Sequence, residues 1–68
     1  MSVAKVIEVI ASSSKGFDDA VAQGIARATD SLDDVAGAWI QDQQVVVTKG
    51  KITEYRVTLK VTFVLKKA

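Results

Sequence analysis

The side chains that most often carry enzyme chemistry are missing from this sequence of 68 residues. It has no Cys and no His, which removes the usual thiolate nucleophile and the usual general base near neutral pH. Its four Gly residues are scattered, so no glycine-rich loop is available to bind a phosphate. The serine run Ser12 to Ser14 has no base partner and is typical of a turn or a helix cap. We therefore expect a protein that is not an enzyme.

Two residues are candidates for contact with an organic ligand. Trp39 is the only Trp, and its indole can either stack on a planar ligand or fill a subunit interface. Arg56 stands in a segment of alternating polar and apolar residues. Its guanidinium can bind a ligand carbonyl or phosphate, or it can pair with Glu54 or Asp42. Both interpretations stay open for each residue.

An acidic cluster is the third candidate site, this time for a metal ion. Asp30, Asp33 and Asp34 lie at the C-terminal end of a predicted helix. Carboxylates at that end oppose the helix dipole, so a bound cation would be favourable there. Oxygen ligands of this kind suit Ca²⁺ or Mg²⁺. The alternative is an acidic turn that faces water.

The elements that must position these residues are read from the hydrophobic pattern. Residues Ser2–Ile10 are β-branched and mostly apolar, which predicts a strand. An apolar stripe with spacings of three and four predicts a helix over Ser14–Ser31, capped by one of the serines. Small residues such as Gly24 make this helix slim, so another element can pack close to it. Asp33–Gly37 are expected to form a connection, and Trp39–Thr48 the next strand.

The end of the chain has the clearest pattern. Lys49 and Gly50 predict a tight hairpin turn, with a positive φ at the glycine. Beyond the turn, one face of the last strand is apolar: Tyr55, Val57, Leu59, Val61, Phe63 and Leu65. The fold class is therefore α+β. We predict a single β-α-β-β domain over residues 1–68. Its three strands form an antiparallel sheet that packs on one helix, with the first strand beside the last.

Composition favours association and excludes some partners. A lone core is marginal in so short a chain, yet 49% of the residues are hydrophobic. One helix also covers only one face of the sheet, and the sheet has two edges, so we expect a homo-oligomer. A net charge of +1 is too low for a nucleic-acid binder. Glu8 interrupts the N-terminal apolar run, and no segment is long enough to span a membrane, so we expect a cytoplasmic protein.

Nearly the whole chain resembles the dodecins. The resemblance rests on KVIEVIASSSKGFDDAV (residues 5–21), IARATDSL (residues 25–32) and, above all, EYRVTLKVTF (residues 54–63). The length and the order of the elements agree as well. The resemblance implies a hollow homododecamer built from trimers. Many dodecins bind flavins such as riboflavin or FMN and are thought to store or sequester them.

The sequence departs from the flavin-binding dodecins at the two residues that contact the flavin. The stacking Trp of the family falls on Gly37, and Trp39 follows two residues later on the same side of a strand. The Gln that binds the flavin edge falls on Arg56. The segments DSLDD (residues 30–34) and KITEYR (residues 51–56) resemble a second dodecin branch, in which calcium binding is known.

Together these observations predict a non-enzymatic dodecameric cage that binds or stores a small ligand. By family resemblance the first candidate is a flavin, FMN or riboflavin, contacted by Trp39 and Arg56. The alternative is a dodecin without a flavin site, either purely structural or binding Ca²⁺ through Asp30, Asp33 and Asp34. The expected protein partner is the chain itself, with no nucleic acid and no membrane.

Overall fold

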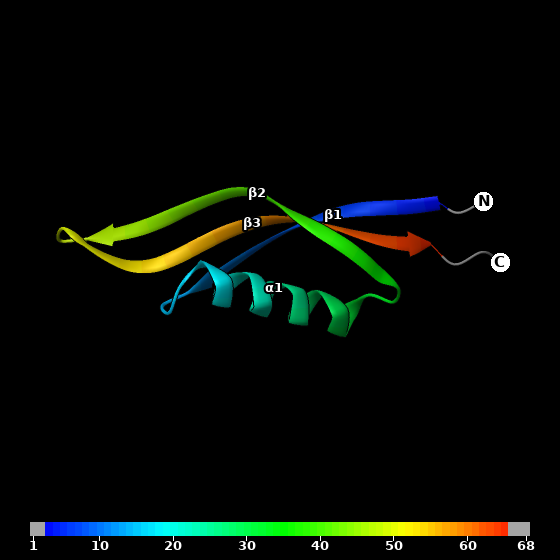
Figure 1. The fold of residues 1–68 in the computed structure, drawn as a ribbon, viewed down its shortest axis with the longest axis horizontal. Coiled ribbons are helices and arrows are strands. Elements are labelled where there is room, and N and C mark those ends of the chain that lie inside the picture. Colours follow the sequence, from blue (N-terminus) through cyan, green and yellow to red (C-terminus); the bar gives the residue numbers. More distant parts are fainter. Residues whose placement is uncertain (1–2, 66–68) are drawn as a thin grey trace.

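The computed structural model describes residues 3–65, which form the four elements expected from the sequence (Figure 1). They are β1 (Val3–Ser13), α1 (Phe17–Ser31), β2 (Val35–Thr48) and β3 (Lys51–Leu65). The strands form one antiparallel sheet in the order β1-β3-β2, so β3 is the central strand. The β-α-β-β fold class and the position of the first strand beside the last are thus confirmed. Ser2, which the sequence places in the first strand, lies outside the described residues.

The core lies between α1 and the apolar face of β3. Val57, Leu59 and Val61 are at most 1% exposed, as the alternation along β3 predicts. They pack with Ala20 and Ala28 of α1. The residues of α1 nearest the sheet are therefore small, because larger side chains there would push the helix away from β3.

Gly24 shows how closely α1 approaches the sheet. A Cβ atom added at Gly24 would lie 2.8 Å from Cδ1 of Leu59 and 3.2 Å from Cβ of Ala11. Contacts that short would force neighbouring atoms to move. The element that packs against the slim helix is thus the sheet of the same chain.

The helix begins later than the sequence suggests. β1 continues through Ser12 and Ser13, which pair with Arg56 and Tyr55 of β3. The helix starts at Phe17, and its N-cap residue is Gly16, with no side-chain cap. The prediction that a serine caps the helix is therefore wrong, because pairing with β3 holds these residues in the strand. Within residues 3–65, no helix is long and apolar enough to cross a membrane.

The second strand begins earlier than expected, at Val35 instead of Trp39. Val35 pairs with Phe63 and packs against the core, which extends the strand into the predicted connection. Asp34 supplies the necessary bend with a φ of 57°, and its carbonyl accepts a hydrogen bond from the Val64 N–H at 3.0 Å. Of the predicted connection Asp33–Gly37, only Asp33 and Asp34 therefore lie outside β2.

The hairpin between β2 and β3 extends well beyond the helix (Figure 1). Its turn has positive φ at both Lys49 (54°) and Gly50 (78°), the signature of a type I′ turn, so the predicted turn is confirmed. The contact between the Phe17 and Tyr55 rings, 5.2 Å apart, lies near the end of the region that α1 covers. We call residues Val45–Glu54, which lie beyond this contact, the hairpin arm.

Candidate functional site

One side of the sheet is covered by α1, and the other side, which we call the open face, is not. On β3 the open face carries the residues that alternate with Val57, Leu59 and Val61. The strand register aligns these residues with partners on the two outer strands. Three rows across β2, β3 and β1 result: Trp39–Lys60–Glu8, Asp42–Thr58–Ile10 and Gln44–Arg56–Ser12. Both organic-ligand candidates, Trp39 and Arg56, therefore lie on the open face.

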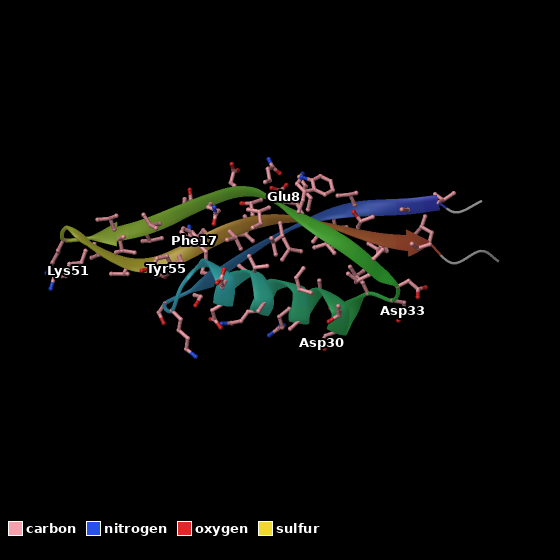
Figure 2. All side chains as sticks on the ribbon, in the orientation of Figure 1. Glu8, Phe17, Asp30, Asp33, Lys51 and Tyr55 are labelled. Carbon is pink, nitrogen blue, oxygen red and sulfur yellow. The ribbon has the colours of Figure 1, made fainter. Side chains whose placement is uncertain are left out.

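Trp39 presents an exposed indole next to an ion pair. Its side chain is 53% exposed, and its partner in the register is Lys60. Nζ of Lys60 lies 3.5 Å from Oε1 of Glu8, which Figure 2 shows on the side away from α1. Gly37 pairs with Thr62 two residues along β3, so Gly37 and Trp39 share this face, as predicted. The site thus offers a flat apolar surface beside Lys60, whose charge is paired with Glu8 on the far strand.

Arg56 is held by two contacts on the open face. Its Nε donates a hydrogen bond to Oγ of Ser12 at 3.1 Å, and its Nη2 donates one to Oε1 of Glu54 at 3.4 Å. The expected ion pair is thus made with Glu54, while Asp42 lies in the neighbouring row of the sheet. This pair is partly exposed and contributes little to stability. A guanidinium has five N–H donors, so Arg56 can still bind a ligand.

Trp39 and Arg56 are not brought together within one subunit. The partner of Trp39 on β3 is Lys60, four residues from Arg56. At the rise of a β-strand, that separation is roughly 13 Å. Within one chain, the two residues therefore lie in different rows of the sheet and do not form one compact site.

The acidic cluster lies at the opposite end of α1 from the hairpin arm. Figure 2 shows Asp30 on the last turn of the helix and Asp33 beyond its end. Within residues 3–65, no group of three or more His, Cys, Asp or Glu side chains is close enough to hold a metal ion. Asp30, Asp33 and Asp34 are thus neighbours in sequence but do not form a complete metal site in one subunit.

A buried hydroxyl joins β1 to α1 in a network that sequence reasoning did not find. Ser13 is 6% exposed, and its Oγ donates a hydrogen bond to Oδ2 of Asp19 at 2.6 Å. Nε2 of Gln23 donates to the same oxygen at 2.5 Å, and the Lys15 N–H donates to Ser13 Oγ at 2.9 Å. The hydrogen bonds from Ser13 and then Gln23 lower the pKa of Asp19. The sequence signal was the spacing of four between Asp19 and Gln23 on a helix.

The fold defines a small β-α-β-β subunit with one uncovered sheet face and an arm that projects beyond its helix. The family model described as Dodecin matches residues 3–66. The chain belongs to the dodecin family.

The chain is similar to dodecins from two other organisms. The calcium dodecin of Mycobacterium tuberculosis is 42% identical over 69 aligned residues, which cover 100% of this chain and 96% of that protein. A crystal structure of that calcium dodecin, described as having a novel calcium-binding site, has a TM-score of 0.84 at 38% identity and covers 98% of this chain and 96% of its own. Dodecin from Streptomyces davaonensis has a TM-score of 0.92 at 27% identity, with 97% of each chain covered.

Proposed function

We propose that this chain assembles into a hollow homododecamer, built from trimers, that binds or stores a small ligand and catalyses no reaction. Membership of the dodecin family supports the cage. The exposed apolar residues of the open face agree with burial between subunits, since Ile10 is 63% and Val6 44% exposed. The lack of His and Cys supports a binding role over catalysis. The cytoplasmic location stays a prediction from the sequence.

We propose Ca²⁺ as the ligand. The observation that carries this proposal is the 42% identity, over the whole chain, to a protein named calcium dodecin. Asp30, Asp33 and Asp34 supply oxygen ligands of the type that Ca²⁺ prefers. Because Ca²⁺ takes six to eight oxygen ligands, the rest of the site comes from backbone carbonyls, water or a neighbouring subunit.

The test is calorimetric titration of the purified particle with CaCl₂. We expect saturable heat for the wild type and a loss of affinity of at least about tenfold for Asp33→Asn and Asp34→Asn, which remove a charged ligand each. Asp18→Asn, at the other end of α1, is the matched control and should titrate like the wild type. Equal Ca²⁺ affinity in all four proteins would contradict the proposal that Asp33 and Asp34 are ligands. Absence of heat would contradict Ca²⁺ binding, and the alternatives would then be a flavin-binding cage or a purely structural one.

A flavin is the second candidate, favoured by the exposed indole of Trp39. In this proposal Trp39 of one subunit stacks on the ring, and Arg56 of another subunit meets its polar edge. Arg56 only donates hydrogen bonds, so a ring N–H would lose the acceptor that a Gln provides. A phosphate group would gain a charge-assisted hydrogen bond instead. We therefore propose weak flavin binding with a preference for FMN over riboflavin.

A further inference from the structure

One subunit has more surface than a compact protein of its mass. Its accessible surface is 4939 Å², whereas a folded monomer of 7.3 kDa exposes about 4,200 Å². Its radius of gyration is 14.1 Å, against about 11 Å for a compact domain of 68 residues. The surplus of roughly 700–800 Å² is close to what each partner buries in a standard protein interface, about 800 Å². The isolated subunit thus has the surface of a protein that lacks a partner.

The hairpin arm carries part of this surplus as apolar side chains. Val45, Val47 and Ile52 are 39%, 57% and 53% exposed. Val47 and Ile52 are partners across the two strands, so they form one apolar pair near the tip. Figure 2 shows Lys51 at the tip, far from α1, so none of the described helix can cover this pair.

A groove with matching chemistry lies between α1 and β2. Its volume is about 450 Å³, and the residues that line it are uncharged: Val21, Ile25, Ala38, Trp39, Ile40 and Leu59. Trp39 borders the groove from the edge strand β2, while the register directs its side chain to the open face. Ile40 in its wall is 46% exposed although it pairs with the buried Leu59. The groove exists because α1 packs mainly over β1 and β3 and leaves this part of β2 uncovered.

The arm cannot fill the groove of its own chain. Ile40 and Val47 are seven residues apart on the same strand, which places them roughly 23 Å apart at the rise of an extended chain. A hairpin that continues straight from β2 therefore carries its tip away from the groove. Only a second copy of the chain can bring such an arm to this position.

We propose that the hairpin arm of one subunit packs into the α1–β2 groove of a neighbouring subunit. The arm and the groove are different surfaces, so the contact is heterologous, and such contacts close into a ring when the rotation between subunits permits. The inference rests on the proposed assembly and deepens it, because a ring of three gives the proposed trimer. Val47 and Ile52 enter the groove beside Ile40, and each subunit gives one arm and receives one.

The absence of Cys from the chain allows a direct test by disulfide trapping. We expect Ile52→Cys and Ile40→Cys, purified separately, refolded together and mildly oxidised, to form a disulfide-linked dimer on a non-reducing gel. Each variant alone should stay uncrosslinked, because like positions do not meet. A chain with both substitutions should give a ladder that ends at the trimer. The matched control pairs Ile52→Cys with Thr58→Cys on the open face and should not crosslink.

Charge complementation is a second test that does not depend on disulfide geometry. Ile52→Lys and Ile40→Asp should each shift the particle to smaller species in light scattering, because each buries an unpaired charge. The double variant should recover the large particle, because the two charges then meet across the contact. A double variant at least as small as the worse single variant would contradict the arm–groove contact.

Light scattering separates failure of this inference from failure of the proposed cage. A particle of twelve chains with no crosslink between positions 40 and 52 and no complementation overturns the arm–groove contact alone. A monomer overturns both. A groove that binds an apolar dye equally in the assembled wild type and in Ile52→Lys would be a small-molecule site, which also overturns the contact.

Discussion

At the scale of single residues, Trp39 and Arg56 are the side chains of the open face that we propose for flavin binding. Their positions along the sheet are roughly 13 Å apart, and in the proposed flavin site they contact one ring from two different subunits. We expect Trp39→Ala to abolish the quenching of FMN fluorescence, because the stacking surface is removed. Titration of FMN and riboflavin at high micromolar protein measures this effect. Gln43→Ala, whose strand partner Val57 belongs to the helix side of the sheet, is the control and should quench like the wild type. If the wild type quenches neither flavin, flavin binding is ruled out.

Asp19 makes stability depend on pH. Its pKa is lowered in the folded state by hydrogen bonds from Ser13 and Gln23. A lowered pKa stabilises the fold above the unfolded value, about 3.9 for Asp, and this stabilisation is lost as the pH falls through the folded pKa. We therefore expect Asp19→Asn to lower the urea midpoint at pH 7, with the difference from the wild type closing below about pH 3.9.

The control for this prediction is Asp18→Asn, which alters a carboxylate in the same first turn of α1. Asp18 is exposed, so its substitution should change the urea midpoint less than that of Asp19. Equal effects of the two substitutions would indicate that only the helix dipole matters. A difference in urea midpoint between Asp19→Asn and the wild type that stays constant down to pH 2 would also contradict a role for the ionised Asp19.

At the scale of elements, the faces of β3 have separate roles. Leu59 is 1% exposed and packs under α1, so Leu59→Ala should lower the free energy of unfolding by roughly 2–5 kcal/mol. Thr58→Ala, one residue away on the open face, should change stability much less and act on assembly or ligand binding instead. Chemical denaturation at matched chain concentration measures both, because unfolding of an oligomer depends on concentration. Small and equal effects of Leu59→Ala and Thr58→Ala would indicate that the assigned register of β3 is wrong.

The sequence predicts the elements that have strong local patterns. Alternation identifies both faces of β3, and Lys49-Gly50 identifies the turn, because these signals come from neighbouring residues. The start of β2 depends on the pairing of Val35 with Phe63 and on the hydrogen bond from Val64 to Asp34. Ser12 and Ser13 are held in β1 by pairing with β3. Such contacts join residues far apart in sequence, and local propensity does not contain them.

The candidate site is predicted less completely for the same reason. The sequence identifies Trp39 and Arg56 as candidates, but their common face and their distance require the register of β2, which has an irregularity between Ile40 and Asp42. The hydrogen bond from Ser13 to Asp19 crosses a turn between two elements. The acidic cluster is adjacent in sequence, yet the connection after α1 does not gather it into a metal site within residues 3–65.

At the scale of the whole molecule, the subunit is extended and apolar on its surface, which agrees with the proposed assembly. Its extents are 53 × 19 × 13 Å, and large hydrophobic side chains are exposed on all three strands. We expect light scattering to give the mass of twelve chains of 7.3 kDa, with no stable monomer at micromolar concentration. In the proposed cage, burial of Ile10 and Val6 on the open face supplies part of the driving force, so we expect Ile10→Asp to lower the mass of the particle. Lys15→Asp, an exposed change of charge in the loop before α1, is the control and should leave the mass unchanged. A folded wild-type monomer, with the circular dichroism of the assembled protein, would contradict the cage.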